Sequence, residues 1–395
     1  MKLSLKQVRV GVVGLTLVLL SGWAGFRLGQ ADRPKQIDPQ TVDLSLFWQV
    51  WDKLEASYLQ PDAFDRQTMV YGAIKGMTAA LGDPYTVFLP PQANKETKEE
   101  LDGAFEGVGI QLGFKNGQLA VMSPLEGMPA KAAGVRAGDL ILHIKDEAKN
   151  IDQDTLDLSL PEAVRLIRGA KGTSVALTIL HQDSSEPLTL TIKRDTIVVA
   201  SVELDWVGED KNIAHLKLTR FGGRTDAEWQ AAVKELISRN PRGIILDLRN
   251  NPGGYLQGAV SLAGEFLSPG KLVVKQADGR GRVETYSVDR QGRLLSQTLV
   301  ILVNQGSASS SEILAGALKD YGRGKLVGET TFGKGTVQEA LDVADGAGLH
   351  VTTAKWLLPS GLWVNDSKGL TPDVVVKDDP ESEADEQLIK AIEEL

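Results

Sequence analysis

Short apolar runs alternate with segments of helical periodicity through the second half of the chain. Four runs are short enough to be buried strands: residues 213–218, 243–248, 299–303 and 325–328. Segments with apolar residues at helical spacing lie between them: 225–238, 254–266 and 310–319. Strands that alternate with helices predict a largely parallel sheet with helical crossovers.

The first half of the chain reads differently. Apolar residues recur at helical spacing between residues 44 and 81, and Gly82-Asp83-Pro84 ends the second helix. From residue 103 onward, short strand patterns contain one strong hairpin signal, Asn116-Gly117, and two short helical stretches, 129–134 and 160–168. These patterns predict a small helical unit followed by a compact β-rich module.

A chain of 395 residues is long enough for two or three domains, so we expect a multidomain α+β and α/β protein. The carboxyl-terminal residues Leu388, Ile389, Ile392 and Leu395 share one helical face and predict a closing helix. The predicted boundaries are 1–30 for a signal anchor or signal peptide, 31–43 for a linker, 44–102 for the helical unit, 103–197 for the β-rich module, 198–378 for the parallel-sheet core and 379–395 for the closing helix.

The amino terminus carries a targeting pattern. Lys2, Lys6 and Arg9 precede an apolar run over residues 10–26, which Arg27 closes. Positive charge before an apolar stretch is typical of an export signal or a membrane anchor. The run is close to the shortest length that spans a bilayer, and a cleavage site is poorly formed, so we favour a retained anchor over a cleaved signal, and both over a buried helix of the fold. We therefore expect an extracytoplasmic location, the periplasm or the cell exterior.

Composition excludes several functions. The net charge of −9 argues against a general affinity for nucleic acid or anionic lipid. Because the chain has no cysteine, it has no disulfide framework, thiolate nucleophile or cysteine–zinc site. No HExxH motif or close cluster of histidine and acidic residues indicates a metal, and the four scattered histidines, His143, His181, His215 and His350, are interpreted as structural or surface residues.

Three turns rich in glycine or serine follow predicted strands. The first ends in Gly253-Gly254, where adjacent glycines let backbone N–H groups approach an oxyanion. The second carries Ser309 at the start of a helix, with the N–H of Ser310 beside it. The third carries Lys334, which can act as a base if its surroundings lower its pKa. This combination predicts bond cleavage with Ser309 as nucleophile and Lys334 as base.

Each turn has an ordinary interpretation as well. A Gly-Gly turn can simply cap a helix, a serine cluster at a helix start is more often an N-cap, and a lysine between glycines is usually solvated. Residues 328–336 also come close to a phosphate loop, but Gly335 stands where that motif needs Ser or Thr. A Ser-x-x-Lys signature is absent as well, so Lys334 must reach Ser309 through the fold.

These segments resemble the carboxyl-terminal processing peptidases (tail-specific proteases), which are serine peptidases with an embedded PDZ domain. The resemblance covers most of the chain from about residue 44 and is most specific at residues 247–254, 306–312 and 332–338. It implies a serine–lysine dyad of Ser309 and Lys334, with Gln338 positioning the lysine. It also implies an oxyanion hole at the turn of Gly253 and Gly254 and the N–H of Ser310, and no cofactor. Ser309-Ser310-Ser311 replaces the usual Ser-Ala-Ser, which leaves Ser311 as a rival nucleophile.

The β-rich module resembles a PDZ domain. Its carboxylate-binding loop then corresponds to Gly107, Val108, Gly109 and Ile110, and Arg168 to a family arginine that links peptide capture to the protease core. This resemblance implies that an apolar carboxyl terminus of an unfolded or tailed protein binds there as an added strand.

We therefore expect an exported serine endopeptidase that recognises the carboxyl-terminal tail of its substrates and cleaves them through an acyl-enzyme. The alternatives are a PDZ-bearing scaffold or chaperone that does not cut, and a nucleotide-binding protein that uses residues 328–336. The sequence leaves open a homo-oligomer or an adaptor protein as a further partner.

Overall fold

The computed structural model describes residues 42–61, 64–115, 117–156, 158–378, 382 and 384–395. The chain divides between Gly72 and Ala73 into two compact units. The first unit contains α2 (Ser45–Ser57), and α3 (Arg66–Ala79) runs across the division. The two helices predicted between residues 44 and 81 are therefore confirmed. No residue of α2 is buried, so its apolar side chains are largely exposed.

A six-stranded sheet forms the centre of the second unit. Its order is β10 (Val202–Val207), β11 (Ile213–Leu218), β12 (Gly243–Asp247), β15 (Thr298–Val303), β16 (Lys325–Gly328) and β19 (Val374–Val375). The first pair is antiparallel and all the others are parallel. Every residue of β12 is buried, as expected for a parallel sheet whose two faces are both covered. The predicted parallel sheet is confirmed.

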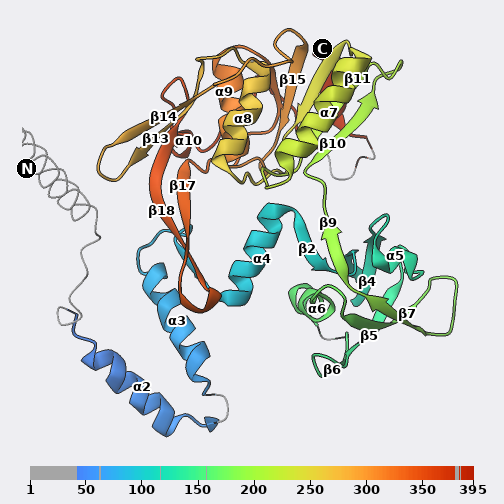
Figure 1. Cartoon of the computed structure of the whole chain (residues 1–395), viewed down its shortest axis with the longest axis vertical. Helices are drawn as coiled ribbons and strands as arrows, with labels where there is room; N and C mark the ends of the chain where they lie inside the picture. Colours follow the sequence, from blue (N-terminus) through green and yellow to red (C-terminus); the bar gives the residue numbers. More distant parts are fainter. Residues whose placement is uncertain (1–41, 62–63, 116, 157, 379–381, 383) are drawn as a thin grey trace, which may run out of the picture. The chain divides into compact units, whose positions relative to one another are not determined.

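Helices cover both faces of this sheet, and alternate side chains of each strand meet different helices. The helices α7 (Thr225–Arg239), α8 (Leu256–Phe266) and α9 (Ser310–Asp320) share one apolar core with Ile244 and Leu246 of β12 (Figure 1). Ile245, between those two residues, instead packs in a second cluster with α11 (Glu386–Glu393). The predicted closing helix is therefore present, and it packs on the opposite face.

A second, antiparallel sheet adjoins the core. It contains β1 (Val87–Leu89), β18 (Gly348–Leu357), β13 (Leu272–Asp278) and β14 (Val283–Ser287) in that order, and β17 (Thr336–Asp342) also pairs with β18. Figure 1 shows β17 and β18 as a long two-stranded ribbon, joined by the 3-10 turn Ala344–Gly346. None of these strands was predicted from the sequence.

The β-rich module has its own core. Its sheet runs β3 (Ile110–Lys115), β4 (Gln118–Pro124), β5 (Leu140–Asp146), β7 (Ser174–Leu180) and β8 (Leu188–Lys193), and β6 (Ile151–Asp154) pairs with β5. The helices α5 (Pro129–Ala132) and α6 (Leu160–Ile167) accompany this sheet. Two further strands, β2 (Ala104–Gly107) and β9 (Asp195–Val198), pair with each other, and α4 (Pro91–Asp102) precedes β2.

The targeting prediction for residues 10–26 falls outside the described residues. Within the part of the chain that the structure describes, no helix has the length and apolar character that crossing a membrane requires. The predicted hairpin turn at Asn116-Gly117 is described only at Gly117, whose φ of +80° is left-handed, and the two strands flanking it pair as predicted.

Candidate active site

Three adjacent parallel strands bring the three predicted turns together. β12, β15 and β16 are neighbours in the sheet, and each leads directly into one of the turns. Carboxyl ends of parallel strands meet at one edge of a sheet, which is where ligands bind in open α/β folds. Gly253, Ser309 and Lys334, which the sequence predicted as site residues, line one cavity of about 640 Å³ at this edge.

Ser309 occupies a strained backbone conformation at the N-cap of α9. Its φ is +55° and its ψ is −116°, a backbone conformation that residues other than glycine rarely adopt. Ser309 is partly exposed, whereas the hydroxyl groups of its neighbours are engaged. Ser307 donates to the carbonyl of Leu248 (2.8 Å), and Ser311, which is fully buried, donates to the carbonyl of Asn251 (2.9 Å). The geometry therefore argues against Ser311 as the nucleophile.

Glu312 ties the serine turn to the lysine turn. Its buried carboxylate accepts from the N–H of Ser309 (2.9 Å), the hydroxyl of Thr331 (2.6 Å) and the N–H groups of Gly333 (2.7 Å) and Lys334 (3.0 Å). Burial raises the pKa of Glu312, although these four donors act in the opposite direction. Two backbone amides that a phosphate loop would offer to a nucleotide are thus already bound to a carboxylate, which argues against the nucleotide alternative.

Lys334 extends from its turn into the cavity. Its Nζ lies 4.6 Å from the centre of the Tyr85 ring. Burial lowers the pKa of Lys334, while the negative charges of Asp83 and Glu312 oppose that shift. A lysine whose ordinary pKa is about 10.4 needs such a shift before it can accept a proton at neutral pH. Among the described residues, no hydrogen bond joins Lys334 to Ser309.

Gln338 and His350 line the same cavity. The side-chain amide of Gln338 donates to the hydroxyl groups of Thr336 (2.9 Å) and Thr352 (3.1 Å), so its role toward Lys334 stays a prediction. His350 was interpreted from the sequence as structural or surface. Burial and the positive charges of Lys334 and Lys98 lower its pKa.

The glycine turn lies directly against Ser309. The φ values of Gly253 and Gly254 are +100° and +138°, and both residues pack too closely for a side chain. A Cβ on Gly254 would lie 2.1 Å from the carbonyl oxygen of Phe221. The N–H of Gly253 donates to the side chain of Asn251 (2.9 Å), whereas the N–H of Gly254 has no hydrogen-bond partner within the described ranges. The hydroxyl of Ser310 donates to the carbonyl of Gly254 (3.0 Å).

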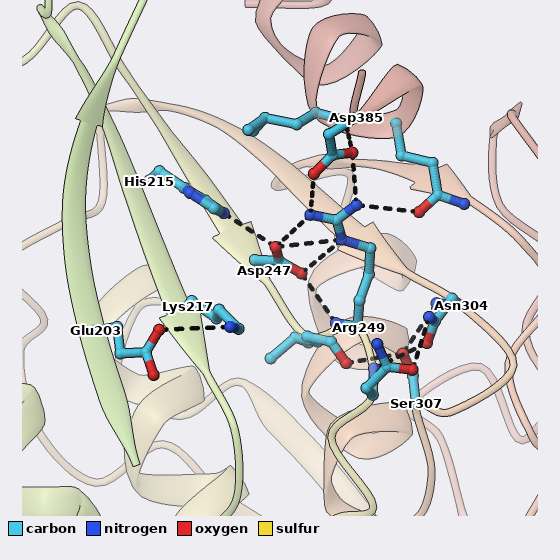
Figure 2. Close-up of polar contacts among 12 residues, drawn as sticks. Glu203, His215, Lys217, Asp247, Arg249, Asn304, Ser307 and Asp385 are labelled. Atoms are coloured by element: carbon cyan, nitrogen blue, oxygen red, sulfur yellow. Dashed lines mark hydrogen bonds and ion pairs between the residues drawn. The ribbon is translucent and has the colours of Figure 1, made fainter. Parts of the chain in front are cut away.

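A buried charge cluster lies at the end of β12, just before this turn. Asp247 accepts from His215 on β11 (2.9 Å) and from Arg249, and Arg249 also binds Asp385 through two hydrogen bonds of 2.7 and 2.9 Å. Figure 2 shows the guanidinium of Arg249 between the two carboxylates. Burial would raise the pKa of Asp247, but hydrogen bonds from His215 and Arg249 outweigh it and lower the pKa to about 2.

Arg249 and Asp247 anchor the glycine turn to the closing helix. Asp385 is the N-cap of α11 and accepts from the N–H of Leu388 (2.8 Å). One arginine thus joins the strand before the active-site turn to the first turn of a helix on the far face of the sheet. No role was predicted from the sequence for Asp247, Arg249 or Asp385.

The predicted peptide-binding loop lies at the start of β3. Val108 is buried in the core of the β-rich module, Ile110 is partly buried against it, and Gly109 has a φ of +77°. A Cβ on Gly109 would lie 2.5 Å from the side chain of Met128, so only glycine fits. The guanidinium of Arg168 lies 4.2 Å from the centre of the Phe105 ring, on β2.

Sequence reasoning missed several residues around the predicted dyad of Ser309 and Lys334. Glu312 stands three residues after Ser309, the spacing of a capping box, and this signal could have indicated it. Tyr85 and Asp83 lie far from Lys334 in the chain, and no local pattern connects them to it. In the part of the chain that the structure describes, no cluster of histidine or acidic residues could hold a metal ion.

Comparisons with known proteins identify the family of this chain. The family model for peptidase family S41 matches residues 212–376, and that for the PDZ domain matches residues 121–181. The carboxy-terminal processing protease CtpA of Bacillus subtilis (strain 168) is 36% identical over 368 residues, which cover 92% of this chain and 76% of CtpA. The carboxy-terminal processing protease CtpB of the same organism is 32% identical over 387 residues, covering 94% of this chain and 78% of CtpB.

Solved structures of proteases also match this chain. A photosystem II D1 C-terminal processing protease superposes with a TM-score of 0.50 at 32% identity, covering 88% of this chain and 92% of that protein. A putative S41 protease from Bacteroides fragilis NCTC 9343 has the same fold, with a TM-score of 0.57 at 15% identity, covering 91% of this chain and 98% of that protein. The chain belongs to the carboxy-terminal processing proteases of peptidase family S41, serine-type peptidases with a PDZ domain.

Proposed function

We propose that this protein is an exported endopeptidase that captures the carboxyl-terminal tail of a substrate on its PDZ domain and cleaves it with a dyad of Ser309 and Lys334. One observation carries the proposal. A strained serine at a helix N-terminus and a lysine whose pKa is lowered by burial line the same cavity. A peptide bond lying in that cavity would meet a nucleophile and a base together.

The chemistry follows from these two groups. The neutral amine of Lys334 takes the proton of the Ser309 hydroxyl as the oxygen attacks the carbonyl carbon of the peptide bond. The amine product leaves with a proton returned by Lys334, and an ester to Ser309 remains. Water then attacks this ester, with Lys334 again accepting a proton; the new carboxyl terminus leaves, and Lys334 returns that proton to the Ser309 oxygen.

The negative oxygen of the intermediate needs backbone donors. Gly253 already donates to Asn251, so we assign the oxyanion hole to the N–H groups of Gly254 and Ser310. Two observations support this assignment. Gly253, the neighbour of Gly254, packs against Ser309 and Ser310. Ser310 lies in the first turn of α9, and the N-terminal end of a helix stabilises developing negative charge.

Substrate capture is assigned to the β-rich module. The segment of Gly107, Val108, Gly109 and Ile110 leads into β3, and an extended peptide would add beside that strand, facing α6. Val108 and Ile110 belong to the apolar core or its margin, which suits an apolar terminal side chain. For Arg168 we keep the role of linking peptide capture to the protease core.

Export rests on the sequence alone. Lys2, Lys6 and Arg9 precede the apolar run 10–26, the pattern of an export signal or a retained anchor. An anchored enzyme of this kind would act on proteins outside the cytoplasm, and the membrane and a second copy of the chain or an adaptor are its further proposed partners.

Cleavage of casein and of a peptide with an apolar carboxyl terminus tests the dyad. Ser309→Ala and Lys334→Ala should each abolish cleavage and keep the thermal midpoint within a few degrees of the parent. His350→Ala is the matched control, because His350 lines the same cavity as Lys334 and is also a potential base. Robust cleavage by the Lys334 variant together with loss of cleavage in the His350 variant would replace the proposed base with the histidine.

A carboxyl-terminal amide on the same peptide tests capture. Blocking the free carboxylate should raise the KM for this peptide. The turnover of a short internal peptide should stay unchanged. Equal KM values for the free and amidated peptides would remove the PDZ domain from substrate recognition.

A further inference from the structure

The side-chain amine of Lys334 lies over an aromatic ring from a distant part of the chain. Tyr85 lies between α3 and β1, in the second unit, and its ring centre is 4.6 Å from the lysine Nζ. A cation over a ring face is attracted by the electron density of that face, and a neutral amine is not. The ring therefore distinguishes the two protonation states of the lysine.

The segment that carries Tyr85 is firmly held. Asp83 accepts from the N–H of Tyr85 (3.0 Å) and from the hydroxyl of Thr86 (2.6 Å), and Thr86 in turn accepts from the N–H of Thr352 on β18 (3.1 Å). The next residues, Val87–Leu89, pair with β18 as β1. The ring is thus fixed to the same strand pair that follows Lys334 in the chain.

The charges around the lysine act together with the ring. Asp83 and Glu312 face it with negative charge, and His350 lines the cavity on β18. Burial raises the pKa of Tyr85, and the charges of Asp83 and Glu312 add to that shift, so the phenol stays neutral when the carboxylates are charged. Among the described residues no hydrogen bond joins Ser309 to Lys334. The ammonium group therefore lies over the Tyr85 ring and is not hydrogen-bonded to the nucleophile.

We propose that Tyr85 is a positioning residue for the base: its ring holds the Lys334 ammonium in a resting site, and loss of the proton releases the amine toward Ser309. This inference rests on the proposed dyad and adds a resting state to it. A substrate that displaces the side chain from the ring would also promote its deprotonation. The ring therefore couples the position of the base to its charge.

The pH dependence of kcat/KM tests this role, because its acid limb reports the pKa of the base in the free enzyme. Tyr85→Leu keeps apolar bulk and removes the attraction for a cation. Its acid limb should move to lower pH by about half a unit to one unit. Tyr85→Phe keeps the ring face and should leave the limb unchanged. Phenylalanines of increasing fluorination at position 85 keep the shape of the ring and should move the limb downward in steps.

Tyr321→Leu is the matched control. Tyr321 lies 4.6 Å from the Nζ of Lys271, the same geometry outside the cavity, so this variant should lose a similar cation contact without moving the limb. An acid limb that moves upward in Tyr85→Leu and stays in place through the fluorinated series would mean that the ring only excludes water, and a limb unchanged in all these variants would mean that it has no role. Either result overturns the inference. If Lys334→Ala still cleaves, the dyad itself fails, which separates the two outcomes.

Discussion

Gly253 lies so close to Ser309 that no side chain fits between them: a Cβ added to Gly253 would lie 2.8 Å from the Cβ of Ser309 and 3.0 Å from the backbone nitrogen of Ser310. The glycine belongs to the turn after β12 and the serine to the turn after β15. The turn that carries the proposed oxyanion donor Gly254 and the turn that carries the proposed nucleophile therefore lie against each other.

Gly253→Ala should disturb both the proposed oxyanion hole and the proposed nucleophile, Ser309. The added methyl meets the serine turn, and a φ of +100° strains any side chain, so we expect cleavage to fall by at least about a hundredfold, the loss typical of a damaged oxyanion hole. Gly270→Ala is the control, since Gly270 also has a left-handed φ, +82°, with no atom within 4 Å of the added carbon. Steady-state cleavage and thermal melting of both variants decide this. Equal activity in the two variants would contradict the close approach.

Ser309→Gly should separate function from stability. Ser309 holds a φ of +55°, which costs a non-glycine residue of the order of 1 kcal/mol and costs glycine little. We therefore expect Ser309→Gly to be inactive and more stable than Ser309→Ala by about 1 kcal/mol. Denaturant unfolding of the two inactive variants measures the difference. An alanine variant as stable as the glycine variant would show that the turn is not strained.

Arg249→Met should destabilise the core and impair catalysis together. It leaves the buried charge of Asp247 without its main partner, which costs about 3–5 kcal/mol in comparable buried pairs. It also releases the closing helix at Asp385 and the turn that begins at Asn250. Asp385→Asn, which removes only the outer half of the cluster, should have a smaller effect.

Lys217→Met is the control for Arg249→Met. Lys217 and Glu203 form an ion pair on the neighbouring strands, drawn in Figure 2, and both side chains are more than 40% exposed. Such a pair contributes at most about 1 kcal/mol. If unfolding experiments find the same loss for Lys217→Met and Arg249→Met, the buried cluster has no special role.

The lowered pKa of Asp247 in this cluster makes the stability of the fold depend on pH in acid. A carboxyl group whose pKa is lower in the folded protein contributes stability above its unfolded pKa and loses it as the pH falls through the folded pKa. For Asp247 these values are 3.8 and about 2, so its contribution, about 2 kcal/mol, should disappear between about pH 4 and pH 2. Unfolding free energies across this range should fall less steeply in Asp247→Asn than in the parent. Identical slopes would mean that folding does not lower the pKa of Asp247.

Much of the core could be predicted from sequence because burial on both sides leaves unbroken apolar runs. β12 and β15 are examples, and the helix that begins at Ser310 has its apolar residues at regular spacing. The second sheet could not be found in this way. β14 and β17 are mostly exposed and carry mixed residues, so no alternation marks them. α4 buries only Asn94 and therefore lacks an apolar face.

Only part of the candidate site could be predicted from the sequence. The three turns could be recognised because each follows a strand, and the order of the strands brings them together. The partners of Lys334 could not, since Tyr85 and Asp83 reach it only through the pairing of β1 with β18. Long-range pairing of short strands leaves little trace in the local sequence.

Rapid-quench mass spectrometry of the enzyme during turnover of an ester or peptide substrate tests the central claim most directly. We expect an acyl group on Ser309 in the parent protein, none on the buried Ser311, and no acyl-enzyme when Lys334 is replaced by methionine. An acyl group on any other residue, or one that forms at the parent rate without Lys334, would contradict this claim.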